Sequence, residues 1–488
     1  MTILPTRAEN AARNHGLGRE DDVDAAELLQ EITDYCRSAG LAESTFGKLA
    51  VNDGKFVNRL RDGGRITAAT LERIRNFIGA NPAPADSNGR PFVVTPRRTG
   101  ATPAAAEAAD ANPKTEEKNF RFFDNRQKYL LFVNTCSEKW VVADRISSEL
   151  VNLKPHPPAV RVFDAGIGDG TVLTRVMRSM HNRYQSMPFY IVGKEISLED
   201  VRLALEKMPD RFYEHPATVL VVTNMNYQDA PWLVPQSLTE ATSLVWHEVA
   251  LSGKTSHDFE EQITGLQPFL AENWRTSPSK KTGNPVYDRP TVMVIYREDH
   301  RFLLDQVIPK RGAGRADYDL IMASQPFRAR ASLDFKAKRV LAPLSRALGP
   351  GGRLLSIHSH GNDPGHEILQ GVWPGENPFI HDRHQLLKAV KTELGNVARN
   401  YNFNTYSDAR SLFRYQMHSL PSEVTESIGT STLFAAWNAA IYVGQIEDAR
   451  LEGVIGDRHY LDVTKEVLHK HGGLWFWDES YVISKRPD

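Results

Sequence analysis

An aspartate and three glycines alternate along the chain at Asp164, Gly166, Gly168 and Gly170, directly after the apolar run of residues 160–163. Glycine lets the backbone approach a ligand closely and adopt positive φ angles. A helical pattern begins near residue 172, and the start of a helix offers free N–H groups to an anionic group. The spacing therefore predicts a ligand-binding turn between a strand and a helix.

Two further apolar runs also end in polar residues. Residues 189–193 run into Glu195, and residues 217–222 run into Asn224. In a doubly wound sheet, an acid at the end of the second strand can accept hydrogen bonds from both ribose hydroxyls. The dinucleotide fingerprint G-x-G-x-x-G would require glycine at Thr171. A nicotinamide or other nucleotide, and a plain tight turn with no ligand, remain as alternatives.

This spacing resembles motif I of the class I S-adenosylmethionine-dependent methyltransferase superfamily. The resemblance implies S-adenosylmethionine as the cofactor, with Asp164 accepting from its amino group and Glu195 from its ribose hydroxyls. It also implies that Asn224 and Met225 lie beside the adenine. The predicted cofactor-binding residues are Asp164, Gly166, Gly168, Gly170, Glu195, Asn224 and Met225.

The elements that must position these residues read as one α/β domain over residues 118–488. Residues 317–323 predict a fourth strand and residues 353–358 a fifth, joined by a helix and a Gly-Pro-Gly-Gly turn. This order is typical of the same superfamily, and we predict its Rossmann-like, seven-stranded sheet. Residues 231–316 and 361–470 are large insertions, which usually build a substrate pocket or a lid.

Candidate chemistry follows the fourth strand at Ser324-Gln325-Pro326-Phe327. This segment loosely resembles the [Asp/Asn/Ser]-Pro-Pro-[Tyr/Phe] motif of N-methyltransferases, in which oxygen atoms accept hydrogen bonds from an amine and the ring stacks on it. Gln325 stands where that motif has proline, so a plain strand-to-helix loop is the alternative. N-methylation is slightly favoured, with the acceptor unidentified.

His358 follows the fifth strand and is a candidate general base, with a surface histidine as the alternative. Its polar cluster lacks the helical His-x-x-x-His spacing of a metal site, so we predict no metal. The predicted catalytic residues are Ser324, Gln325, Phe327 and His358.

Residues 23–80 have the apolar spacing of several short helices and resemble the helix-turn-helix of repressor-like DNA-binding domains. Residues 51–80 contain six Lys and Arg residues against three Asp and Glu, an excess that suits contact with phosphates. The predicted DNA-contacting residues are Lys55, Asn58, Arg59 and Arg61. The alternative is a packing or homodimerisation module.

Composition sets the remaining bounds. The chain has 488 residues, a formal net charge of −1 and two cysteines, which exclude a globally basic nucleic-acid coat and a disulfide framework. We expect a cytoplasmic protein without a secretory signal or a membrane partner. Residues 1–22 are expected to be flexible, and the proline-rich residues 81–117 to form a disordered linker.

The most direct interpretation of the whole sequence is an S-adenosylmethionine-dependent methyltransferase. Two other functions fit parts of it: a ligand-sensing transcription regulator that uses the same fold, and a DNA methyltransferase. The presence of both Asp164 and Glu195 favours cofactor binding and hence an active enzyme.

Overall fold

The computed structural model describes residues 20–39, 43–51, 53–61, 68–80, 126–279, 285–419, 424 and 428–487. They belong to two compact units, one within Met1–Pro113 and the other within Lys114–Asp488. The predicted linker, residues 81–117, lies outside the described residues. The first helix begins at Glu20, inside the stretch that was expected to be flexible, and residues 1–19 are not described.

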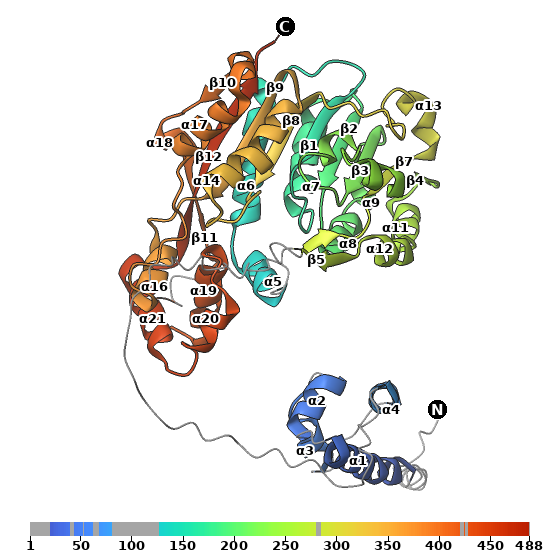
Figure 1. The fold of residues 1–488 in the computed structure, drawn as a ribbon, viewed down its shortest axis with the longest axis vertical. Helices are drawn as coiled ribbons and strands as arrows, with labels where there is room; N and C mark the ends of the chain where they lie inside the picture. The colour runs from blue at the N-terminus through green and yellow to red at the C-terminus, as the bar shows by residue number, and fades with distance from the viewer. Residues whose placement is uncertain are drawn as a thin grey trace, which may run out of the picture. The chain divides into compact units, whose positions relative to one another are not determined.

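The small unit contains four helices (Figure 1): α1 (Glu20–Ala39), α2 (Glu43–Val51), α3 (Phe56–Arg61) and α4 (Ala68–Ala80). Each helix contributes apolar side chains to one shared core. The Phe46 ring meets those of Tyr35 and Phe77 edge to face, with ring centres 5.6 and 5.5 Å apart. These contacts hold the short helices together, because helices of this length are marginal alone.

The residues predicted to contact DNA lie on α3 or just before it. Arg59 forms an ion pair of 2.5 Å with Asp53, and Arg61 one of 2.8 Å with Glu43. Lys55 is exposed. The two arginines are thus already partnered by carboxylates of their own unit, which reduces the positive charge offered to phosphates. DNA binding by this unit stays a prediction.

The described residues of the large unit form one sheet of ten strands. Nine of them lie in the order β10-β12-β9-β8-β1-β2-β3-β7-β4, and β11 pairs with β12 off this path. Their bounds are β1 Val160–Asp164, β2 Phe189–Lys194, β3 Thr218–Thr223, β4 Val245–Leu251, β7 Thr291–Arg297, β8 Tyr318–Ser324, β9 Leu348–Ser359, β10 Tyr401–Asn404, β11 Leu412–Gln416 and β12 Trp475–Lys485.

The prediction of seven strands was therefore wrong in number. Strands β4 and β7 belong to the first insertion, and they extend the sheet beyond β3. All seven residues of β7 are buried, so this strand is part of the core rather than of a separate lid. Strands β3, β2, β1, β8 and β9 run parallel, whereas β7, β12, β10 and β11 introduce the antiparallel pairs.

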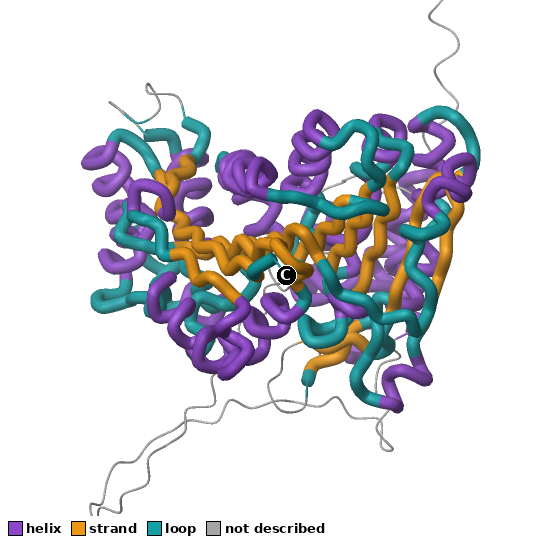
Figure 2. The backbone as a smooth tube through the Cα atoms, turned by 90° about the horizontal axis from the view of Figure 1, so that it is seen from above, coloured by secondary structure: helices purple, strands orange, loops and turns teal. Residues whose placement is uncertain are grey.

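Helices cover both faces of this sheet (Figure 2). One core cluster includes Leu344 and Leu386, and the other includes Val176 and Phe259. The helices of this unit include α6 Glu138–Ser147, α7 Thr171–Arg183, α8 Leu198–Glu206, α9 Pro209–Glu214, α10 Leu238–Ser243, α11 Ser256–Thr264, α12 Gln267–Asn273, α13 Arg301–Leu304, α14 Leu333–Phe335, α15 Ala342–Arg346, α17 Arg383–Leu394 and α18 Asp408–Ser411.

A third cluster joins the start of this unit to its second insertion. It contains residues of α5 (Arg126–Thr135), α16 (Pro364–Val372), α19 (Thr430–Val443), α20 (Asp448–Glu452) and α21 (His459–His471). Helix α5 thereby packs against α19, more than 300 residues later in the sequence. None of the described helices has the length and apolar character that crossing a membrane requires.

Candidate functional site

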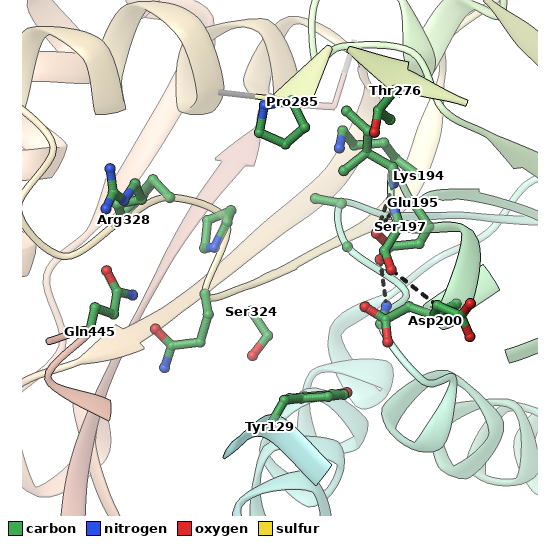
Figure 3. Close-up of a pocket in the computed structure, with 18 of the residues that line it drawn as sticks. Tyr129, Lys194, Glu195, Ser197, Asp200, Thr276, Pro285, Ser324, Arg328 and Gln445 are labelled. Carbon is green, nitrogen blue, oxygen red and sulfur yellow. Dashed lines mark hydrogen bonds between the residues drawn. The ribbon is translucent and has the colours of Figure 1, made fainter. Parts of the chain in front are cut away.

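A cavity of about 790 Å³ opens beside the carboxyl ends of β1, β2 and β8 (Figure 3). Parallel strands present their carboxyl ends at one edge of the sheet, which is where ligands bind in open α/β folds. The turn after β1 contributes Gly166 and Gly168, and the end of β2 contributes Lys194 and Glu195. The loop after β8, helices α5 and α19, and the antiparallel pair of β5 (Thr276–Pro278) and β6 (Pro285–Tyr287) also contribute to the wall.

The glycine turn divides into two parts with different physical roles. A Cβ atom on Gly166 would meet nothing within 4 Å, so this glycine leaves open space on the cavity side. Gly170 has a φ of +77° at the start of α7, and a Cβ there would lie 2.8 Å from the Cα of Ala204. Gly166 and Gly168 therefore face the ligand space, whereas Gly170 permits close packing of α7 against α8.

Asp164 lies at the base of this turn and is 4% exposed. Its carboxylate accepts a hydrogen bond of 3.1 Å from the N–H of Gly166. Burial raises the pKa of Asp164 to about 7, the Glu195 carboxylate adds to that rise, and the Gly166 bond opposes it. A ligand with a positive charge would stabilise the ionised form of this buried carboxyl.

Glu195 accepts three backbone hydrogen bonds. Its Oε1 takes the N–H groups of Ile196 and Ser197 at 2.7 and 2.9 Å, and its Oε2 takes that of Gly168 at 2.9 Å. The indole of Trp274 donates to the backbone carbonyl of Glu195 at 2.8 Å. The carboxylate thus ties β2 to the glycine turn, and Oε2 keeps a lone pair for a further donor.

Asn224 and Met225 are placed differently from the prediction. Neither belongs to the described residues that line the cavity. The Asn224 side-chain oxygen accepts from the N–H of Thr291 at 2.8 Å, and its amide donates to the Arg289 carbonyl at 2.9 Å. Met225 is fully buried in the core. Asn224 instead fastens β3 to β7, the strand that the first insertion adds.

The loop after β8 does reach the cavity, where Ser324, Gln325 and Phe327 all contribute to the wall. Gln325 has a φ of +49°, and its side chain is turned toward β9 and β12. Its amide nitrogen donates to Ser359 Oγ at 3.1 Å and to Asp478 Oδ1 at 3.3 Å. Gln325 therefore fixes this loop, and its amide is committed within the protein.

His358 does not line the cavity among the described residues. It is 6% exposed, and its Nε2 lies 3.3 Å from Oε2 of Glu479 on β12. Its ring packs edge to face on Tyr481, with centres 5.7 Å apart. The candidate general base is thus a buried histidine paired with a carboxylate, because β12 pairs with β9 and places Glu479 opposite His358.

Helix α5 supplies cavity residues that the sequence reasoning missed. The Tyr129 hydroxyl lies 3.3 Å from Oδ1 of Asp169, and a Cβ on Gly168 would lie 3.4 Å from that hydroxyl. Phe132 stacks on Tyr442 of α19, with ring centres 4.6 Å apart. The apolar spacing of residues 129–132 is too short to predict a helix over the turn, and only the fold brings α19 beside it.

Lys139 is the second functional candidate that was missed. It lines the cavity and also a small side lobe that Asp164 and Gly166 share. Its ammonium lies 3.4 Å from Oε2 of Glu138. Burial lowers the pKa of Lys139, but the Glu138 carboxylate, Tyr442 and Asp169 together outweigh this effect and the pKa is raised. A fixed positive charge thus stands beside the buried carboxyl of Asp164.

No protein-family model and no curated protein matches the sequence. Among solved structures, the chain is similar to the cyclopropane synthase MmaA2 from Mycobacterium tuberculosis at 13% identity and a TM-score of 0.31, over 77% of this chain and 100% of that one. It is also similar to a geranyl diphosphate methyltransferase solved with S-adenosylmethionine at 11% identity and a TM-score of 0.28, over 70% and 85%. A putative sarcosine dimethylglycine methyltransferase from Galdieria sulphuraria gives 10% identity and a TM-score of 0.27, over 72% and 85%. Similarity this low transfers neither a site nor an activity.

Proposed function

We propose that this chain is an S-adenosylmethionine-dependent methyltransferase that acts on a small molecule inside the cavity. The observation that carries the proposal is the set of carboxylates around the glycine turn. Asp164, Glu195 and Asp200 lie at or near the ends of β1 and β2, beside a turn whose Gly166 leaves open space. Carboxylates in this arrangement favour a ligand with positive charge and free hydroxyls.

The same charges argue against a dinucleotide. A pyrophosphate at this turn would meet three carboxylates, and like charges repel strongly where water is excluded. S-adenosylmethionine instead carries a sulfonium, an ammonium and two ribose hydroxyls. The proposal therefore follows from the sign of the charge at the turn, in addition to the glycine spacing.

The residues present suit each part of this cofactor. Asp164 would hold the ammonium and Lys139 the carboxylate of its methionine part, because the two charges stand together at the side lobe. The free lone pair of Glu195 would accept from a ribose hydroxyl. When bound, the cofactor supplies an electrophilic methyl group, and the aromatic rings of Tyr129 and Phe132 keep the site poor in water.

The volume also suits two ligands at once. Small-molecule pockets are typically about 300–1,000 Å³, and this cavity of about 790 Å³ extends from the glycine turn to the loop after β8. A cofactor on the turn leaves the space beside Ser324 and Phe327 for an acceptor. The methyl group would then lie between the two, where transfer requires close and aligned atoms.

Calorimetry on the purified full-length protein tests the proposal. S-adenosylhomocysteine should bind, and NAD+ should bind at least about 100-fold more weakly, since a 2.7 kcal/mol difference corresponds to that ratio. 5′-Methylthioadenosine lacks the amino acid part, so its affinity should be intermediate and unchanged by Lys139→Met. The proposal is wrong if S-adenosylhomocysteine does not bind, or if NAD+ binds as tightly.

A further inference from the structure

The cavity has a second side that faces away from the glycine turn. Lys194 and Glu195 are successive residues at the end of β2, so their side chains leave opposite faces of the strand. Glu195 turns to the glycine turn, whereas the Lys194 ammonium lies 5.0 Å from the centre of the Tyr227 ring. Figure 3 shows Lys194 and Arg328 on opposite sides of the cavity, with Pro285 between them.

Burial lowers the pKa of Lys194, whereas the Glu195 carboxylate attracts the Lys194 ammonium from a distance. Within the part of the chain that the structure describes, the Lys194 ammonium forms neither an ion pair nor a hydrogen bond. The oxygens of Glu195 already accept three N–H groups, and the carboxylate of Asp288, across the cavity wall, accepts from the Ser277 hydroxyl at 2.6 Å. A cation that is drawn out of water without an anion is costly to the protein.

The neighbours of Lys194 place it on the acceptor side. The Tyr227 hydroxyl donates to the Pro326 carbonyl at 3.0 Å, so Tyr227 connects Lys194 to the loop after β8. Phe327 of that loop and Pro285 of β6 add apolar surface to the same wall. An acceptor on this side would meet the Lys194 ammonium beside the apolar surface of Tyr227, Phe327 and Pro285, and Arg275 and Arg328 also line the cavity.

We propose that the methyl acceptor carries an anionic group, a carboxylate or a phosphate, and that Lys194 binds this group. The inference rests on the proposed function, because the acceptor side is defined by a cofactor on the glycine turn. The rest of the acceptor is apolar and lies against Tyr227 and Phe327. Lys194 thus anchors one end while the other end reaches Ser324.

Binding of matched probes tests this inference without knowledge of the true acceptor. Full-length protein saturated with S-adenosylhomocysteine, which fills the cofactor side, is titrated with 3-phenylpropionate, phenyl phosphate, 3-phenylpropanol and 3-phenylpropylamine. The better anion should bind about 10- to 150-fold more tightly than the neutral alcohol, as a hydrogen bond to a charged group provides. Whether 3-phenylpropionate or phenyl phosphate binds more tightly identifies the group.

Two variants make the result specific. Lys194→Met should remove the preference for the anion, and Lys194→Arg should keep most of it. The matched control is Lys139→Met, which should weaken S-adenosylhomocysteine and leave the anion preference intact. Thermal unfolding of each variant verifies that it is folded.

The outcomes separate the two proposals. If S-adenosylhomocysteine binds but the anions bind no better than the alcohol, or if the amine is preferred, the inference about Lys194 is wrong and the proposed function stands. The same holds if Lys194→Met keeps the preference, or if no probe binds at ~10 mM, well above the 1 mM that corresponds to about −4.1 kcal/mol. If S-adenosylhomocysteine itself fails to bind, the proposed function is wrong.

Discussion

The carboxylate of Glu195 accepts the backbone N–H of Gly168 at 2.9 Å, so the end of β2 holds the glycine turn of β1 in place. The side chain therefore has two tasks in one position. It fixes the shape of the turn through backbone bonds, and it faces the cavity with a remaining lone pair. Ligand binding and local stability are coupled at this residue.

Changing Glu195 to Ala should lower both properties. Hydrogen bonds to charged groups contribute about 1.5–3 kcal/mol, so affinity for S-adenosylhomocysteine should fall about 10- to 150-fold. The variant also leaves three N–H groups without their acceptor, and the free energy of unfolding should fall by a similar amount. Glu195→Gln keeps one acceptor oxygen, so its affinity and its free energy of unfolding should lie between those of the wild type and Glu195→Ala. Equal affinity of wild type and Glu195→Ala, by calorimetry, would contradict the role assigned here.

The raised pKa of Asp164 predicts a pH dependence of cofactor binding. Below about pH 7 the carboxyl of the free protein is protonated, and an ammonium ligand requires the ionised form. Affinity for S-adenosylhomocysteine should therefore rise with pH up to about 7 and then level off, with proton release on binding. Calorimetry in two buffers of different ionisation enthalpy measures that release.

Asp200 also has a pKa raised to about 7, by burial and by the Glu195 carboxylate, so it serves as the control. Asp164→Asn should flatten the pH profile and weaken binding more than Asp200→Asn does, because Asp164 would contact the ammonium directly. The folded protein keeps Asp164 protonated at pH values where an unfolded chain has already lost that proton. The free energy of unfolding should therefore fall as the pH rises from about 4 to 7. Asp164→Asn should accordingly stabilise the ligand-free protein at pH 8, by about 1–4 kcal/mol. A pH slope that persists in Asp164→Asn would assign the titration to another group.

Two glycines of the turn should respond in opposite ways to the same substitution. Gly166→Ala adds a methyl group to open space, so stability should stay the same or rise by up to about 1 kcal/mol. Affinity for S-adenosylhomocysteine should nevertheless fall at least about 10-fold, because the methyl group occupies the ligand space. In Gly170→Ala the added methyl group would meet Ala204, and alanine would have to adopt a positive φ. The free energy of unfolding should therefore fall by about 2–4 kcal/mol. Denaturant unfolding and calorimetry measure both effects, and a destabilised Gly166→Ala would show that the turn is closed in solution.

The site divides into features with a local origin and features that depend on distant packing. The turn after β1 and the acid after β2 depend only on neighbouring residues. Each can be predicted because an apolar run ends in glycines or in an acidic residue. Asn224 also follows an apolar strand, but the first insertion adds β7 beside β3. The backbone N–H of Thr291 then donates a hydrogen bond to the Asn224 side chain. No local pattern announces such a partner. The same cause applies to the strands that the insertions add to the sheet, β4 and β7 from the first and β10 and β11 from the second.

His358 and Lys194 show the same limit from two sides. His358 lies near the end of β9, where a catalytic base could reach the cavity, but its partner Glu479 belongs to β12, the last described strand of the chain. Lys194 reads as an ordinary polar residue at a strand end, and only the fold shows that its ammonium reaches the cavity and forms no ion pair with a described residue. Contacts between distant segments decide which polar residues are already satisfied and which remain for a ligand.

Gln325 allows backbone strain and side-chain contacts to be separated in the loop after β8. Its positive φ costs a residue with a side chain on the order of 1 kcal/mol or more, whereas glycine adopts this conformation freely. Gln325→Ala keeps the strain and removes the bonds to Ser359 and Asp478, so stability should fall by about 2–4 kcal/mol. Gln325→Gly removes the same bonds and relieves the strain, so it should be about 1 kcal/mol more stable than Gln325→Ala.

The exposed Gln416 of β11 provides the matched control for this last comparison. Glycine is less favourable than alanine in an extended strand, so the order of the two variants should reverse there. Denaturant unfolding of all four variants gives the two differences directly. If Gln325→Ala is as stable as Gln325→Gly, the loop does not hold a left-handed residue at this position. The rigidity of this loop as a wall for the acceptor would then have to come from the hydrogen bond of Tyr227 to the Pro326 carbonyl.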